Sequence, residues 1–431
     1  MTSRSRPPSR NDAYVWIWLP GTTDPVVAGR LVREGDRLIF NYGQSYLART
    51  DAMAIYLPEL PLQRGALVPE PGLSMAGCLR DGAPDAWGRR VILNKTLGLR
   101  GRDANVEELP ELTYLLESGS DRIGALDFQI SPTEYTRRGG RATPLQELLH
   151  AAEKVDAGTP LLPELDQALF HGSSLGGARP KAIIDDGEHK LIAKFSSSND
   201  THDVVKAEFV AMRLAEKVGL DVAPVRLEHV AGKDVLLVER FDRTRIDTGI
   251  WQRKAMVSAL TLFGLDEMMA RYASYADLTE IVRHRFTEPR ETLRELFGRL
   301  VFNILCGNTD DHARNHAAFW DGARLTLTPA YDICPQNRSG NEASQAMLIV
   351  GEDRRSRLAT CLDAAPAFML DAATAEKMIA QQIRSLRAAW DEVMEEAAMS
   401  EVERRLLQQR IFLNPFIFEG APPKLQALQQ T

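Results

Sequence analysis

The chain has 431 residues, of which 44% are hydrophobic and 26% charged, and this composition excludes a collagen-like, low-complexity or disordered acidic chain. A length of about three ordinary domains predicts two or three lobes. The formal net charge of -7 is not that of a typical nucleic-acid-binding protein, although a local basic patch stays compatible with it.

The N-terminal third predicts a tail followed by a β-rich subdomain. Residues 1–12 are rich in Arg and Pro and are typical of a mobile tail. In residues 13–135, the runs YVWIWL, RLIFNY and AMAIYL between Tyr14 and Leu57 favour a small antiparallel sheet. The segment PDAWGRRVILNKTLG then predicts a helix that stops near Gly98.

Residues 136–241 predict a second part of the small lobe, built around a Gly-rich segment. A helix is expected from about Thr143 to Asp156, and the segment HGSSLGGARP comes after it. The alternating segments KAIID and HKLIAKF that follow predict two strands joined by a turn. A helix over about Asp203 to Val218, closed by Gly219, and the strands PVRLEHV and VLLVERF complete this part.

Residues 242–431 predict a mainly helical lobe. Apolar residues in LRELFGRLVFNIL recur at the spacing of a buried amphipathic helix. The polar run GNTDDHARN ends that helix, and HAAFW and LTLTPAYDI follow as a hairpin-like pair. Helices are expected again from about 373 to 413.

The four cysteines are scattered without a C-x-x-C pair, which argues against a zinc site and a disulfide framework. We expect reduced, mostly packed thiols. No apolar run is long enough for a membrane helix, and the N-terminus lacks the apolar stretch of a secretory signal. We therefore expect a cytoplasmic protein that does not bind membranes.

Four polar features suit phosphoryl transfer, which needs amides and cations around phosphates, oxygen ligands for magnesium and a carboxylate for the attacking hydroxyl. Glycines at 172, 176 and 177 would let the backbone approach a phosphate, and Lys181 and Lys194 add positive charge. From this stretch alone, a plain structural turn is the more common explanation of such glycines. No G-x-x-x-x-G-K-[ST] loop occurs, which argues against a P-loop enzyme.

The remaining two features are acidic. Asp310 and Asn315 have the separation of the Asp and Asn in the kinase loop H-R-D-x-x-x-x-N. Asp332 follows an apolar strand at the distance where kinases place a metal-binding Asp, although Tyr331 and Ile333 replace the usual D-F-G neighbours. The structural alternative is that Asp310 caps a helix and Asp332 starts a turn.

Two rival motifs share these segments. GSSLG matches the G-x-S-x-G elbow with Ser174 as nucleophile, but strands follow this loop where a hydrolase has a helix. His312 and His316 are spaced for a zinc pair on a helix, but no H-E-x-x-H pattern or third ligand is evident. A role in bracing the acidic loop is the better interpretation of these histidines.

As an ordered set, GSSLGGARPKA, LIAKF, VERFDR, GNTDDHARN and LTPAYDI closely resemble the HipA family of bacterial toxin kinases. The matching region runs from Gly172 to Asp332, and CLRDGAPDAWGRRVI resembles an N-terminal segment of the same family. The resemblance implies an α+β, two-lobed protein-kinase-like fold, with a mixed β/α N-terminal lobe and a mainly helical C-terminal lobe. It also implies a serine/threonine kinase that depends on ATP and Mg²⁺.

The resemblance assigns roles to individual residues. Asp310 matches the catalytic Asp, and Asn315 and Asp332 match the metal ligands. The implied nucleotide-binding residues are Gly176, Gly177, Ala178, Lys181, Lys194, Glu239, Phe241, His312, Asn315 and Asp332. Of these, Lys194 matches the strand lysine on the phosphates, Lys181 ends the Gly-rich motif, and Glu239 and Phe241 fall where the hinge meets adenine. Glu208 is the candidate ion-pair partner of Lys194.

The resemblance also implies regulation. In such families a serine of the Gly-rich motif is autophosphorylated, which inactivates the enzyme, and here that serine is Ser174, with Ser173 as the neighbouring alternative. A phosphate there would be repelled by the phosphates of the nucleotide. The segment GGARPK departs from the commoner form of the motif at Arg179 and Pro180.

The partners that the resemblance implies are a helix-turn-helix antitoxin of the HipB type, operator DNA reached through that antitoxin, and a protein substrate, with aminoacyl-tRNA synthetases as the family precedent. The alternative hypothesis is a catalytically silent member that binds antitoxin and DNA. In that case basic residues such as Arg354, Arg355 and Arg357 would contact phosphates, although such a run is more often a solvated face.

Overall fold

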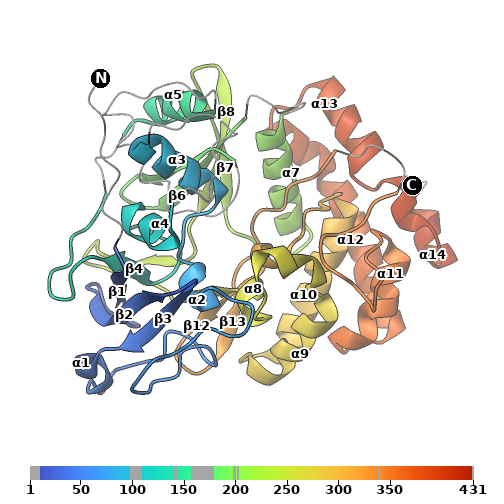
Figure 1. Cartoon of the computed structure of the whole chain (residues 1–431). Coiled ribbons are helices and arrows are strands. Elements are labelled where there is room, and N and C mark those ends of the chain that lie inside the picture. Colours follow the sequence, from blue (N-terminus) through green and yellow to red (C-terminus); the bar gives the residue numbers. More distant parts are fainter. Residues whose placement is uncertain are drawn as a thin grey trace. The chain divides into compact units, whose positions relative to one another are not determined.

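The computed structural model describes residues 10–97, 109–139, 143–156, 179–197, 200, 203–337, 340 and 342–429 (Figure 1). The chain divides into two compact units. Unit 1 consists of Met1–Thr201, Glu228–Val257 and Phe319–Ala323, and unit 2 of His202–Leu227, Ser258–Ala318 and Arg324–Thr431. In the described part of the chain, no helix is long and apolar enough to cross a membrane.

Unit 1 begins with the small antiparallel sheet expected from the sequence. Its strand order is β3-β2-β1-β4, and its strands are β1 (Asp12–Ile17), β2 (Val26–Glu34), β3 (Arg37–Tyr42) and β4 (Leu126–Gln129). β-Branched and aromatic side chains suit these strands because they pack well on a pleated surface. The short helices α1 (Gln44–Leu47), α2 (Gly77–Arg80) and α4 (Glu111–Glu117) accompany the sheet.

The third run predicted as a strand, AMAIYL, is a buried loop, so that prediction is wrong. Side chains satisfy its backbone in place of a strand partner. The hydroxyl of Tyr46 donates to the Met53 carbonyl at 2.8 Å, the Ile55 amide donates to the hydroxyl of Tyr42 at 2.9 Å, and Trp320 Nε1 donates to the Ala54 carbonyl at 2.9 Å. The apolar pattern therefore predicted burial correctly, but hydrogen bonds from side chains take the place of those that a neighbouring strand would make.

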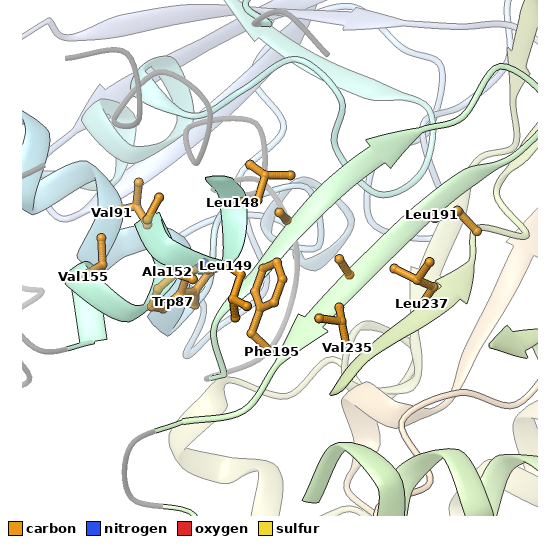
Figure 2. Packing of buried hydrophobic residues seen from close by; sticks show 13 residues of the cluster. Trp87, Val91, Leu148, Leu149, Ala152, Val155, Leu191, Phe195, Val235 and Leu237 are labelled. Atoms are coloured by element: carbon orange, nitrogen blue, oxygen red, sulfur yellow. The ribbon is translucent and has the colours of Figure 1, made fainter. Parts of the chain in front are cut away.

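The second sheet of unit 1 has the order β5-β6-β8-β7. Its strands are β5 (Lys181–Asp185), β6 (Lys190–Phe195), β7 (Val225–Val230) and β8 (Lys233–Glu239), and the chain passes from unit 2 into unit 1 within β7. The helices α3 (Ala86–Leu97) and α5 (Leu145–Asp156) cover one face of this sheet, and Figure 2 shows their side chains meeting it. Trp87 and Val91 of α3 pack with Leu149 of α5 against Phe195 and Leu237, all nearly inaccessible to water. The predicted β5–β6 hairpin and both predicted helices are confirmed.

Two short strands, β9 (Arg243–Arg245) and β10 (Trp251–Arg253), follow β8 as an antiparallel pair. A three-stranded sheet has the order β11-β12-β13, with β11 at Met256–Ser258, β12 at Ala317–Trp320 and β13 at Leu325–Leu327. Strands β12 and β13 confirm the expected hairpin.

Unit 2 is mainly helical. Its helices are α7 (Val204–Lys217), α8 (Ala259–Leu262), α9 (Tyr275–Arg285), α10 (Pro289–Leu305), α11 (Leu358–Ala364), α12 (Ala372–Glu396), α13 (Glu401–Leu406) and α14 (Pro423–Gln426). Single turns lie at Glu267–Tyr272, Ala313–Asn315, Ala365–Phe368, Leu407–Ile411, Pro415–Phe418 and Ala427–Gln429. Helix α10 is buried along most of its length and packs against α9, α11 and α12, as its apolar spacing predicts.

Candidate active site

The candidate catalytic loop begins where α10 ends. Gly307 adopts a left-handed backbone with φ of 71°, which suits the residue that terminates a helix. Asn308 then lies buried, and its amide nitrogen Nδ2 donates to Oδ1 of Asn303 at 3.0 Å. These contacts fix the start of the loop that carries Asp310 to the last turn of α10.

The structure brings Asp310, Asn315 and Asp332 together within unit 2. Nδ2 of Asn315 donates to the main-chain carbonyl of Asp310 at 3.1 Å, which holds the two residues in one turn. Partial desolvation raises the pKa of the Asp310 carboxyl, His312 lowers it, and the neighbouring carboxylates of Asp332 and Asp311 raise it. Asp310 itself is exposed, so its carboxylate is accessible to a reactant.

Asp332 has a left-handed backbone, with φ of 58°. This conformation is uncommon for a residue with a side chain, and such strain is concentrated at functional sites. The preceding residue is held in place, because the hydroxyl of Tyr331 donates to the Arg314 carbonyl at 2.6 Å. Arg314 also pairs with Glu267, which ties the loop to the turn Glu267–Tyr272.

Asp311 faces the interior, unlike its neighbour Asp310. Its carboxylate accepts hydrogen bonds from the hydroxyl of Tyr275 and from Nε2 of His316, the latter at 2.9 Å. Burial would raise the pKa of Asp311, but His316 and the Tyr275 hydroxyl hold it below its usual value. His316 therefore braces the acidic loop, as the sequence indicated.

The oxygen atoms of this group fit a magnesium ion better than zinc. Two carboxylates and one amide match Mg²⁺, which proteins bind through one or two carboxylates together with substrate phosphates. Among the described residues, no group of three or more His, Cys, Asp and Glu side chains could hold a metal. Nε2 of His316 is engaged with Oδ1 of Asp311 at 2.9 Å. The four cysteines are free, and three of them are buried, as expected.

In unit 1, Lys181 and Lys194 are direct cross-strand partners in the β5–β6 hairpin. Opposite residues of a pair project from the same face, so the two lysines share the face opposite the core of Figure 2. Nε1 of Trp87 donates to the Lys181 carbonyl at 3.2 Å, and the Asp85 carboxylate lies 4.0 Å from Nζ of Lys181. The end of β5 is thereby attached to α3.

Glu239 ends β8 and Phe241 follows it. The ring of Phe241 meets that of Phe319 edge-to-face, with centroids 6.0 Å apart. Glu208 is buried on α7 of unit 2, whereas Lys194 belongs to unit 1, so their ion pair stays a prediction. Gly172, Ser173, Ser174, Gly176, Gly177 and Ala178 lie outside the described residues.

The basic run proposed for phosphate binding is engaged with the protein itself. Arg355 and Arg357 both pair with Asp353, at 2.6 and 3.7 Å, and Arg354 donates to the carbonyls of Ala346 and Arg271. Only Arg355 of the three is exposed, so the solvated-face interpretation applies to that residue alone.

Sequence reasoning missed one supporting residue in each unit. Tyr275 lies 36 positions before Asp311, and Asp121 lies 119 positions before Arg240, with which it pairs. No local motif marks either residue, because both act through contacts distant in sequence.

Comparison with known proteins identifies the fold and the family. The HipA protein in the solved complex of the Shewanella oneidensis MR-1 HipA, HipB and operator DNA superposes with a TM-score of 0.69 and 18% identity, over 97% of this chain and 96% of that one. The fold is therefore the α+β, protein-kinase-like fold expected from the sequence. The model of the HipA-like C-terminal domain matches residues 173–390, half of the chain, and that of the HipA N-terminal domain matches residues 17–129. The chain belongs to the HipA family.

Curated relatives are more similar over shorter segments. The chain is 30% identical over 266 residues to Y4mE of Sinorhizobium fredii, a candidate kinase by name, and this match covers 57% of the chain and 60% of Y4mE. It is 29% identical over 183 residues to the serine/threonine-protein kinase toxin HipA of Shewanella oneidensis, covering 37% and 42%. The matches thus span less than two thirds of either relative.

Proposed function

We propose that this protein is a serine/threonine protein kinase that uses ATP and Mg²⁺ and is the toxin of a HipA/HipB-like toxin–antitoxin system in the cytoplasm. The observation that carries the proposal is the grouping of Asp310, Asn315 and Asp332. Within it, the carboxylate of Asp332 lies close enough to Asp310 to raise its pKa, and Asn315 donates to the Asp310 carbonyl. Membership of the HipA family and the similarity to the Shewanella toxin kinase support it.

In this proposal Asp310 accepts the proton of the substrate hydroxyl. A raised pKa suits that role because a stronger base takes the proton more readily near neutral pH. Asn315 and Asp332 would hold magnesium, which neutralises charge on the transferring phosphoryl group. Lys181 and Lys194 bind the phosphates of ATP, and Glu239 and Phe241 meet the adenine.

We further propose Ser174 as the autophosphorylated residue and a helix-turn-helix antitoxin as the partner that connects the kinase to operator DNA. The structural neighbour from Shewanella was solved as a complex of HipA, HipB and operator DNA, which supports such a partner. An aminoacyl-tRNA synthetase is the proposed substrate by family precedent. The alternative of a silent binding module receives no support from Arg354, Arg355 and Arg357, whose contacts are intramolecular.

The test is the intact mass of the full chain after incubation with ATP and Mg²⁺. We expect one added phosphate, mapped to Ser174, on the wild type. The Asp310→Asn variant should lose about 10²- to 10⁴-fold in rate, the usual contribution of a general base. Asp311 cannot replace it because Tyr275 and His316 hold its carboxylate in the interior.

The matched control is Asp371→Asn, the same change in the same unit. Asp371 caps α12, and Asn is an equally good capping residue, so this variant should keep full activity. Near-normal transfer by Asp310→Asn would contradict the role of Asp310. Absence of phosphate from every variant, including protein freshly purified from the expression host, would favour the silent binding module.

A further inference from the structure

Three charged residues next to the proposed adenine-binding segment are buried. Arg240, Asp242 and Arg243 follow β8, and each is less than a tenth exposed. The proposed function uses only Glu239 and Phe241 of this stretch. Burial of charge is unfavourable unless the charges are paired, so the three residues need an explanation.

Their partners belong to residues 121–124, which precede β4. Nη1 of Arg240 lies 3.1 Å from Oδ1 of Asp121, and Nη2 of Arg243 lies 2.8 Å from the same atom. Nη2 of Arg240 also donates to the Arg122 carbonyl at 2.7 Å. One carboxylate from the N-terminal part of unit 1 therefore receives both guanidinium groups.

Asp242 completes the arrangement from the other side. Its Oδ2 accepts from the amide of Gly124 at 2.8 Å and from Nη1 of Arg243 at 2.8 Å. The Gly124 carbonyl also accepts from Nη1 of Arg243, at 3.0 Å. Main chain and side chains of 121–124 are thus joined to 240–243. We call these four residues, Asp121, Arg240, Asp242 and Arg243, the Asp121 cluster.

The surrounding charges make Asp121 the critical member. Nζ of Lys190 lies 4.0 Å from its Oδ2, and Arg253 is half-buried nearby, where its Nη1 donates to the Ser120 carbonyl. Burial and the neighbouring charge of Arg243 lower the pKa of Arg253 to about 9. The carboxylate of Asp121 raises it. Loss of the Asp121 charge would leave Arg240 and Arg243 paired with Asp242, and Lys190 with Asp185.

The cluster holds the segment on both sides of Phe241. Phe241 and Asp242 lie in the turn that follows β8. Phe241 contacts Phe319, whereas Arg240 and Asp242 contact residues 121–124. A shift of either anchor would therefore move the backbone of Glu239–Phe241 as a unit.

We propose that Asp121 is a positioning residue for the adenine-binding segment Glu239–Phe241, so that the N-terminal part of unit 1 sets the preference of the nucleotide site for adenine. The inference rests on the proposed function. It assigns a role to residues 121–124 that the local sequence does not indicate. It also explains why buried charged residues flank Phe241 on both sides in the segment VERFDR.

The experiment is calorimetric titration of the full chain with MgATP and with MgGTP. Asp121→Asn keeps the shape of the side chain and removes its charge. We expect the Kd for ATP to rise about tenfold, equivalent to about 1.4 kcal/mol, while the Kd for GTP stays unchanged. The selectivity for ATP over GTP then falls about tenfold, which a general loss of stability would not produce.

Glu59→Gln is the matched control. Glu59 is a half-buried carboxylate of the same unit whose oxygens accept from the amides of Gly77 and Cys78, at 2.8 Å each. This variant should lose stability but keep the wild-type selectivity. Arg240→Lys, which retains the charge and loses the forked donor, serves if Asp121→Asn does not fold, and it should lower the selectivity by a smaller factor.

Each outcome bears on a definite claim. Unchanged selectivity in folded Asp121→Asn or Arg240→Lys overturns the inference and leaves the kinase proposal standing. A wild type that binds ATP and GTP equally overturns the inference as well, because no adenine preference exists to be set. A wild type that binds neither nucleotide contradicts the proposed function, and the inference falls with it.

Discussion

Asp310 and Asp311 are neighbours in sequence with opposite environments. Asp310 is exposed, and its pKa is raised by partial desolvation and by Asp332, whereas Asp311 is buried and its pKa is held low by His316. The first carboxylate is suited to accept a proton and the second to stay ionised. The buried member anchors the loop that presents the exposed one.

The contact between Tyr275 and Asp311 yields a prediction for catalysis. Tyr275→Phe removes one of two side-chain donors from a buried carboxylate, which costs about 1–3 kcal/mol of stability. Asp310 directly precedes Asp311, so a shift of Asp311 also moves the catalytic carboxylate. We expect the maximal rate of phosphate transfer to fall about tenfold, because small misplacement of a reacting group slows a reaction. The KM for ATP should not change. Rates over a range of ATP concentrations and urea unfolding measure these effects.

Tyr46→Phe provides the control, since its buried hydroxyl donates to the Met53 carbonyl of unit 1. It should lose similar stability and keep the rate. Equal losses of rate in both variants would show that destabilisation alone, and not the bracing of the loop, slows the reaction.

At the residue scale, the sequence predicted the acidic residues of the site but not those that hold them. Asp310, Asn315 and Asp332 lie in short polar runs with a recognisable spacing, and the structure brings them together. Tyr275 begins α9 like any aromatic core residue, and Asp121 lies in a loop. Their partners come from distant segments, which no local pattern reports.

Helix α10 is the element that sets the position of the catalytic loop, and Gly307 is where it ends. A Cβ at this position would lie 3.0 Å from the side chain and from the carbonyl oxygen of Ile411. The amide of Gln336 also donates to the Gly307 carbonyl at 3.0 Å. The helix end is therefore restricted both in conformation and in space.

A left-handed backbone costs an ordinary residue about 1–2 kcal/mol. Gly307→Ala should destabilise the protein by more than this, because the new methyl group also contacts Ile411. Gly219→Ala is the control. Gly219 ends α7 with φ of 92° and open space around its Cβ position. Urea unfolding of both variants compares them, and equal losses would show that space at Gly307 is not limiting.

The elements that the sequence predicted best are those whose partners are close in the chain. The β5–β6 hairpin and the helix α10 follow directly from alternation and from helical spacing. The run 52–57 had the composition of a strand, but Tyr42, Tyr46 and Trp320 supply its hydrogen bonds. Hydrophobic pattern predicts burial in such a case, and tertiary contacts decide the backbone.

For the whole molecule, buried carboxylates predict the response to acid. Burial opposes ionisation of Asp121, Asp127, Asp242 and Asp311, yet arginines beside the first three, and His316 and Tyr275 beside Asp311, hold their pKa values below the ordinary one. A lowered pKa in the folded state gives stability that is present above the unfolded pKa and is lost as the pH falls through the folded value. Burial raises the pKa of Glu59, so protonation of this carboxyl favours the folded state as the pH falls.

We therefore expect the Tm to be nearly constant from pH 7 to about 5 and to fall below about pH 4, the ordinary pKa of aspartate. Thermal melts at half-unit pH steps measure this. Asp127→Asn removes one of the four carboxylates, so its Tm should fall less steeply below pH 4 than that of the wild type. An equally steep fall would show that Asp127 contributes nothing to the acid response.

The packing shown in Figure 2 also bears on how such proteins can change during evolution. Trp87 and Val91 belong to the segment matched by the N-terminal family model, and Phe195 and Leu237 to the segment matched by the C-terminal one, yet the four side chains form one core. The boundary between the two family models is therefore not a boundary between separately packed domains. An exchange of N-terminal domains between relatives succeeds only if helix α3 and the sheet are inherited together.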